Sequence, residues 1–439
     1  MIMLNEDAVA RLIRDFHEER AREPMYDRDM ELPTDFKLSR AISVIGPRRS
    51  GKSYLMLLTI RKLLGKGIER SAILKISFED MVFSNANASD LDMILSTYLK
   101  IYPENAGKVI WLFLDEVQEI GGWERWVRSL LDRGGYRVYI SGSSSKLLSR
   151  ELATQMRGRT LSRAVYTLGF GEFLRFTDTK HGRYMSTSEE AVVAKSAEEY
   201  VMYGGYPEVV LLPGEKEKVL KEIMEVTISR DIVERYGIRN PKVIRMLINA
   251  LANSQEFSAN KFTDFLKSQG YKISKNTIYA YMQALNDSLV VHYARNFSRS
   301  YKAREQSMPK PFFADNGLLA VNGVTDTSRL MENMVFMELL RRHGDGRVFY
   351  AKGQSYDIDF LVAGRKVEQL IQVGYKIDNF MTRDKEFRAL YNASEHLGCN
   401  DLLLITWSTE EEQRYKGKTI KCTPLWKWLL QKPAGQASA

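Results

Sequence analysis

Residues 46 to 53 are the stretch of this sequence with the clearest chemistry. They run Gly-Pro-Arg-Arg-Ser-Gly-Lys-Ser, in which two glycines bracket four residues and are followed by lysine and serine, a phosphate-binding pattern. An apolar run at 41–45 suits a buried strand before it, and helical spacing marks 52–64 after it. Glycine lets backbone N–H groups curl around a phosphate, and the helix start adds its positive dipole end. The pattern therefore predicts a nucleotide-binding loop made of Gly46, Pro47, Arg48, Arg49, Ser50, Gly51, Lys52 and Ser53.

Two carboxylates supply the second nucleotide signature, usually called Walker B. Six apolar residues at 109–114 run directly into Asp115 and Glu116, as in a strand covered on both faces by helices. Acids at the end of such a strand face the ligand crevice of an open α/β sheet. We expect ATP and Mg²⁺ here, with Ser53 and Asp115 as metal ligands. Lys52 is expected to reach the β- and γ-phosphates, and Glu116 to orient the attacking water.

Two further candidates follow at plausible intervals. Residues 136–141 predict another strand, which leads into a serine-rich segment and a helix from Lys146. Ser143 is our candidate to sense the γ-phosphate or the lytic water, and an ordinary helix N-cap is the alternative. Arg159 is our candidate for an arginine finger that stabilises transition-state charge, and a surface arginine in a turn is the alternative.

These motifs together resemble one family, the AAA+-like ATPases widespread in archaea and bacteria. The stretches that carry the resemblance are 46–53, 114–118 with Trp123 and Trp126, 141–148 and 158–159. Later stretches at 204–208, 230–232 and 313–318 are similar to the domain of unknown function that usually follows the ATPase in that family. The resemblance implies an ASCE-type sheet, in which one strand lies between the strand that feeds the loop and the strand that ends at Asp115. It supplies no physiological substrate.

Length and composition limit the class of protein. A chain of 439 residues suggests two to four domains, and 44% apolar residues exclude global disorder. The net charge of +9 is compatible with nucleic acid but does not demonstrate it. Isolated Cys399 and Cys422 argue against a disulfide framework or a zinc site. Without a signal-peptide pattern or an apolar run of about 20 residues, we expect a cytoplasmic protein with no membrane partner.

The expected fold class is α/β, with a P-loop parallel sheet flanked by helices, then a winged helix and a smaller α/β domain. The expected domains are 1–180 (P-loop ATPase), 181–242 (helical connector), 243–300 (winged helix-turn-helix), 301–432 (nuclease-like) and 433–439 (disordered tail).

The winged-helix prediction rests on three helices followed by a strand, at 243–252, 259–267, 275–286 and 289–293. If the third helix docks in a major groove, its exposed side would present Lys275, Asn276, Tyr279 and Gln283. A protein-packing module is the alternative.

The last part resembles the PD-(D/E)xK nuclease fold, with a helix at 330–342 and strands at 347–350, 356–362 and 369–375. That site needs two acids on Mg²⁺ and a lysine two residues after the second acid. Asp359 is present, but the second acid's position holds Gln372 and the lysine position holds Gly374. An amide is a weak Mg²⁺ ligand and glycine supplies no charge. Lys376, expected on the same strand face, is a poor substitute, so we predict the fold without the nuclease activity.

Two functions from different classes remain. One is Mg²⁺-dependent ATP hydrolysis coupled to conformational work on a nucleic acid or protein partner. The other is a slow-turnover, ATP-dependent signalling switch that docks protein partners. The partner stays open between DNA, a protein and a second copy of this chain in a homo-oligomer.

Overall fold

A computed structural model describes residues 4–18, 26–35, 40–143, 156, 158–182, 184–377 and 379–431. The chain forms two compact units, Met1–Val165 with Asp287–Leu289, and Tyr166–Asn286 with Val290–Ala439. The finer division into four domains stays a prediction. Within the described ranges, we find no helix whose length and apolar character would suit a membrane crossing.

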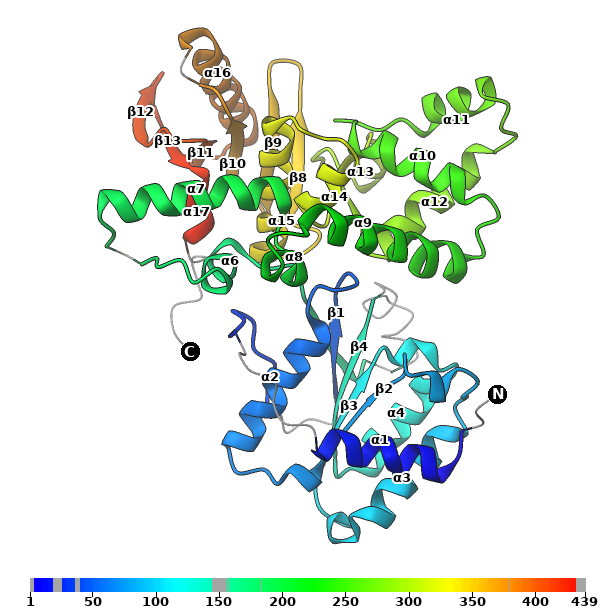
Figure 1. Cartoon of the computed structure of the whole chain (residues 1–439). Helices are drawn as coiled ribbons and strands as arrows, with labels where there is room; N and C mark the ends of the chain where they lie inside the picture. The colour runs from blue at the N-terminus through cyan, green and yellow to red at the C-terminus, as the bar shows by residue number, and fades with distance from the viewer. Residues whose placement is uncertain are drawn as a thin grey trace. The chain divides into compact units, whose positions relative to one another are not determined.

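The first unit contains a parallel five-stranded sheet (Figure 1). Its strands, in spatial order, are β2 (Ile73–Ser77), β3 (Ile110–Asp115), β4 (Tyr136–Gly142), β1 (Ala41–Ile45) and β5 (Thr160–Ala164). Strand β4 therefore lies between β1, which feeds residue 46, and β3, which ends at Asp115. The strand order implied by the family resemblance is confirmed.

Helices cover both faces of this sheet because its central strands are apolar on both sides. In β3, Leu112 and Leu114 pack in one core with residues of α1 (Glu6–Glu18), α3 (Asp90–Ile101) and α4 (Trp123–Arg133). Phe113 points to the opposite face and packs in a second core with α2 (Lys52–Gly65). Alternate side chains of a strand face opposite ways, so burial on both faces requires the unbroken apolar run seen in the sequence. Short 3-10 turns complete the unit: η1 (Arg70–Ala72), η2 (Met81–Phe83), η3 (Pro103–Asn105) and η4 (Val117–Glu119).

The second unit begins with helices. They are α6 (Phe170–Phe176), α7 (Thr187–Tyr203), α8 (Pro207–Leu211), α9 (Lys216–Val226), the π-helical η6 (Thr227–Glu234), α10 (Pro241–Ala252), α11 (Ala259–Ser268) and α12 (Lys275–Asp287). An antiparallel pair follows, β6 (Val291–Ala294) with β7 (Lys310–Phe313), and α13 (Tyr301–Gln306) lies in the connection. The order of three helices and a strand is as expected, but the strand starts two residues later than predicted. Leu289 has φ 54°, a left-handed conformation that an extended strand excludes, so β6 begins only after this residue.

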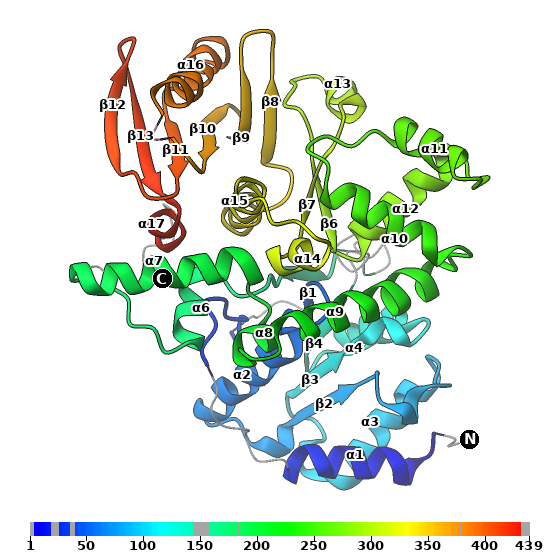
Figure 2. The same ribbon diagram turned by 45° about the horizontal axis from the view of Figure 1, so that its top comes forward.

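A six-stranded mixed sheet completes the second unit (Figure 2). Its strands, in spatial order, are β12 (Glu411–Tyr415), β13 (Lys418–Pro424), β11 (Leu402–Thr406), β10 (Val367–Gly374), β9 (Asp357–Ala363) and β8 (Val348–Lys352). The accompanying helices are α14 (Asn316–Val321), α15 (Thr327–His343), α16 (Phe380–Leu397) and α17 (Leu425–Leu430). Phe360 packs against Phe336 of α15, whereas the next residue, Leu361, shares a core with Leu390 of α16. The two long helices therefore cover opposite faces of the sheet.

Candidate nucleotide-binding site

The loop between β1 and α2 is tightly curled, and its glycines are required by that geometry. A Cβ at Gly46 would lie 2.1 Å from the carbonyl oxygen of Val165 and 2.8 Å from the Ser50 hydroxyl. Gly51, directly before α2, has φ 96°, and Arg49 also has a positive φ of 61°. Glycine at positions 46 and 51 lets the backbone curl closely enough to aim successive N–H groups at one anion.

Lys52 begins α2 and holds its ammonium inside the loop. Its Nζ donates to the carbonyl oxygens of Gly46 at 3.2 Å and Pro47 at 3.1 Å. The same Nζ lies 3.4 Å from Oε1 of Glu116, and the lysine is buried. The structure thus brings together the first predicted motif and the second, which are 64 residues apart (116 minus 52).

Glu116 is held in an uncommon backbone conformation with a fixed carboxylate. Its φ of 50° lies in the left-handed region, which non-glycine residues adopt rarely and at a cost. Its Oε2 accepts hydrogen bonds from the backbone N–H of Ser143 at 3.1 Å and from the Gln118 amide. Burial alone would raise the pKa of this carboxyl, but the Lys52 ammonium and the Gln118 amide outweigh burial and lower it. Glu116 is therefore ionised near neutral pH and aimed at the loop.

Ser141 connects the two acids, and the sequence analysis did not single it out. The Glu116 backbone N–H donates to the Ser141 hydroxyl at 3.0 Å, and that hydroxyl donates to Oδ1 of Asp115. A hydroxyl residue at the end of a predicted strand is the sequence signal that could have identified Ser141. Within the same segment, however, Ser143 was the predicted sensor of the γ-phosphate or the lytic water. Ser143 is buried and touches Glu116 through its backbone N–H. The helix predicted from Lys146 lies outside the described residues.

Two arginines add positive charge around the loop. Arg48 forms an ion pair with Glu79 at 2.8 Å. Arg28, which the sequence analysis passed over, donates from Nη1 to the Ser50 carbonyl oxygen at 3.1 Å. The hydrogen bond from Arg28 helps to hold the loop backbone in one conformation.

The residues present fit a nucleoside triphosphate with Mg²⁺. The cradle that a Cβ at Gly46 would fill and the buried Lys52 ammonium suit phosphate oxygens. Ser53 is exposed on the first turn of α2 and Asp115 ends β3, and both carry the oxygen donors that Mg²⁺ prefers. Over the part of the chain that the structure describes, His, Cys, Asp and Glu form no cluster of three that could hold a metal alone. Mg²⁺ here would need phosphate oxygens to complete its ligands, as is usual for this ion.

The structure does not bring Arg159 to this site. The Ala41 N–H donates to the Arg159 carbonyl oxygen at 2.8 Å, so Arg159 lies beside the N-terminal end of β1. The loop follows the other end of that five-residue strand, ~16 Å away at about 3.3 Å per residue. The guanidinium forms an ion pair with Asp132 at the end of α4. A role as an arginine finger within one chain has no geometric support, and only action on a neighbouring copy stays open.

Comparisons with known proteins agree with this geometry. Residues 38–174 match a family model described as an AAA domain, and residues 194–328 match one described as a domain of unknown function. An uncharacterized protein of Methanocaldococcus jannaschii is 35% identical over 418 residues, which cover 92% of this chain and 91% of the relative. An uncharacterized protein of Haemophilus influenzae is 31% identical over 408 residues, covering 90% and 96%. The chain belongs to this family of AAA-domain proteins. Its first unit is a P-loop domain of the AAA type.

Solved structures show weaker similarity. The Walker-type ATPase of Pyrococcus abyssi is 14% identical with a TM-score of 0.45, covering 73% of this chain and 96% of its own. The ORC1 protein of Aeropyrum pernix, solved in complex with DNA, is 12% identical with a TM-score of 0.30, covering 77% and 95%. At these values neither protein transfers a substrate or partner to this AAA-domain chain.

The nuclease-like site considered in the sequence lies in the C-terminal sheet. Its side chains are engaged in hydrogen bonds with protein groups. Asp359 is partly buried, and its Oδ2 accepts from the Val373 N–H at 2.9 Å. Burial, together with the nearby Glu332 carboxyl, raises the pKa of Asp359 well above its usual range. Gln372 accepts from the Asp359 N–H at 3.2 Å and donates to Glu386 at 2.7 Å. The amide at the second acid's position therefore ties strands β9 and β10 to α16.

The prediction that Lys376 lies on the same strand face is wrong. Strand β10 ends at Gly374, and the chain turns so sharply that a Cβ there would lie 2.6 Å from Cγ2 of Ile377. Lys376 follows the strand, with its ammonium 5.6 Å from the centre of the Tyr375 ring. The same turn explains the glycine, because a lysine at position 374 would collide with Ile377.

Proposed function

We propose that this chain binds ATP with Mg²⁺ and hydrolyses it, and that the energy drives conformational work on a nucleic acid or protein partner. The observation that carries this proposal is the meeting of Lys52 and Glu116 at 3.4 Å, where the loop of residues 46–53 faces the end of β3. A buried cation and a buried, ionised carboxylate at the mouth of a phosphate cradle are the groups that phosphoryl transfer to water requires.

Each group has a separate task in this proposal. The loop N–H groups and Lys52 bind the phosphates and neutralise charge in the ground state and the transition state. Glu116 orients a water molecule and draws on its proton, and its direction is maintained by the Ser141 hydroxyl and the Ser143 N–H. Mg²⁺, when bound through Ser53 and Asp115, would supply further charge neutralisation at the phosphate oxygens.

Paired substitutions separate binding from hydrolysis. We expect Lys52→Ala to lose ATP binding, because it removes the cation that meets the phosphates. We expect Glu116→Gln to keep ATP binding and lose hydrolysis, because Glu116 acts only on the water. Glu119→Gln is the matched control, since it makes the same chemical change at an exposed position on the same segment. Nucleotide binding by calorimetry and turnover by phosphate release would check this, and unchanged turnover in Glu116→Gln would refute the role of that residue.

One observation supports the slow-turnover switch as a second candidate. The Glu116 carboxylate is already engaged by Lys52, the Gln118 amide and the Ser143 N–H, so a water molecule would have to displace one of them. Steady turnover stimulated by DNA or by a protein would favour the first candidate. ATP that co-purifies with the chain and is hydrolysed only rarely would favour the switch.

We further propose a winged helix in α10 to β7 as the contact to DNA. The four side chains named from the sequence, Lys275, Asn276, Tyr279 and Gln283, are all exposed on α12. The Lys275 ammonium lies 5.5 Å from the centre of the Tyr279 ring, so a cation and an aromatic face stand together on this surface. A phosphate backbone would be attracted to such a surface regardless of base sequence.

A further inference from the structure

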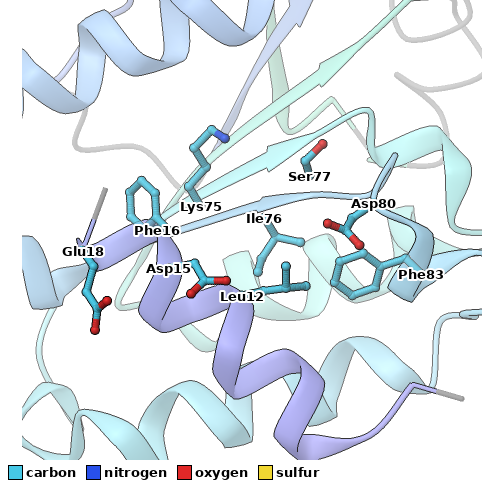
Figure 3. A pocket seen from close by; sticks show the side chains of 9 residues that line it. All are labelled: Leu12, Asp15, Phe16, Glu18, Lys75, Ile76, Ser77, Asp80 and Phe83. Carbon is cyan, nitrogen blue, oxygen red and sulfur yellow. The ribbon is translucent and has the colours of Figure 1, made fainter. Parts of the chain in front are cut away.

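Strand β2 forms the outer edge of the parallel sheet in the first unit, and its free side borders a pocket. Within the described chain β2 pairs only with β3. The pocket has a volume of about 570 Å³ and lies between β2 and α1 (Figure 3). Helix α1 forms one wall of the pocket. It lies outside the matched AAA domain, which starts at residue 38.

The hydrogen bonds of β2 show which backbone groups face this pocket. The Phe78 N–H donates to the Asp115 carbonyl oxygen, so residue 78 is directed toward β3. In a parallel strand the N–H and C=O of one residue point the same way and alternate from residue to residue. Ile76 therefore also faces β3, whereas Lys75 and Ser77 face outward.

Three of the outward groups of β2, on Lys75 and Ser77, lack a hydrogen-bond partner within the described ranges. The Ile73 N–H donates to the Arg70 carbonyl oxygen, and the Asp80 N–H donates to the Ser77 carbonyl oxygen at 3.3 Å. The N–H and C=O of Lys75 and the N–H of Ser77 have no hydrogen-bond partner among the residues that the structure describes. An open strand edge of this kind is a template for a further strand.

The pocket walls determine which chemistry suits the open edge. Figure 3 shows Ile76 pointing toward Leu12 of α1, so one side of the edge is apolar. The charged residues that line the pocket are Asp15, Glu18, Asp80 and Lys75, which give three negative charges against one positive charge. The acids favour a cationic occupant and would repel the phosphates of a nucleic acid. They would also repel a second copy of this edge.

We propose that β2 receives an extended, basic segment of a partner protein, which adds a sixth strand to the sheet through the backbone of Lys75 and Ser77. Its apolar side chains would lie on Leu12 and Ile76. Its basic side chains would alternate to the opposite face, where the field of the surrounding acids, Asp15 and Asp80 among them, would attract them without direct contact. Main-chain hydrogen bonds would supply affinity and the pocket walls would supply specificity, as in other complexes formed by strand addition. The alternative is that β2 is short and carries Lys75 only to prevent edge-to-edge aggregation.

The test uses the full chain and a defined probe. The probe is a short fluorescein-labelled peptide of alternating lysine and valine, and its anisotropy is measured against protein concentration at low salt. Lys75→Pro removes the outward N–H while leaving the bonds to β3, and proline is tolerated where a strand N–H faces solvent. Lys75→Ala is the matched control, because it removes the same side chain and keeps the N–H. A second probe, N-methylated at alternate amides, tests the same hydrogen bonds without changing the protein.

We expect Lys75→Pro and N-methylation each to weaken binding by about tenfold or more. Lys75→Ala should leave binding unchanged or tighter, because it removes a positive charge near the basic peptide. Hydrogen exchange at the Lys75 and Ser77 amides should slow when the peptide is added. Equal binding by Lys75→Pro and Lys75→Ala, equal binding of the methylated probe, or equal binding of a glutamate–valine peptide would overturn the proposal. Self-association that Lys75→Pro abolishes would overturn it in favour of a second copy as the occupant.

Discussion

Replacing Ser141 with alanine tests whether one buried hydroxyl positions both acids of the nucleotide site. The substitution removes the acceptor of the Glu116 N–H and the donor to Asp115, at a position with no exposed surface. A buried backbone N–H left without a partner costs about 1–3 kcal/mol. If that whole loss appears in the transition state, kcat falls roughly 5- to 150-fold. ATP affinity should change much less, because Lys52 and the loop of residues 46–53 are untouched.

Ser43→Ala provides a closely matched control. Ser43 lies on the neighbouring strand β1 and is also fully buried, but its hydroxyl has no hydrogen-bond partner among the described residues. Removing an unsatisfied hydroxyl is expected to be neutral or slightly stabilising. Steady-state kinetics would report kcat and KM, and hydrogen exchange by mass spectrometry would report the local stability of β3 and β4. Equal kcat and equal exchange in Ser141→Ala and Ser43→Ala would refute the positioning role.

Four further predictions concern other parts of the chain. Because Arg159 lies beyond the far end of β1 from the loop, Arg159→Ala should lower kcat less than about tenfold in dilute protein, whereas a concentration-dependent loss of about 10³–10⁵ would show action on a neighbouring copy. Lys275→Glu should weaken binding to duplexes of every sequence and reduce its salt dependence in anisotropy titrations, and failure of the parent chain to bind DNA at low salt would leave the helices as a packing module. Burial raises the pKa of Asp315 to about 6, so the folded chain retains a proton that the unfolded chain releases. Its free energy of unfolding should thus fall by roughly 3 kcal/mol as pH rises from about 4 to about 6, and Asp315→Asn should remove that slope from denaturant titrations. Purified protein with Mg²⁺ or Mn²⁺ should leave DNA and RNA intact, and cleavage that disappears in Asp359→Ala would contradict this.

Local patterns in the sequence determined the elements of the nucleotide site. Two patterns are specific to nucleotide binding: the loop with glycines at 46 and 51, and the apolar run that ends in two acids. Each meets a specific demand of phosphate or metal binding. The family resemblance added the order of the strands, which no periodicity contains. The helix at 259–267 followed from apolar spacing, and its start also has a local cause, because the Ser258 hydroxyl accepts from the Lys261 N–H.

Tertiary structure decided the contacts between segments distant in the sequence. Ser141 and Glu116 meet because β3 and β4 are neighbours, and their hydrogen bond crosses from one strand to the other. Arg159 follows close after the serine-rich segment in the sequence, yet pairing with β1 places it at the opposite end of the sheet. Lys376 leaves its expected face because Ile377 folds back over Gly374. In each case the outcome depends on which strands pair and where the chain turns, and these are set by packing among distant residues rather than by the spacing within one segment.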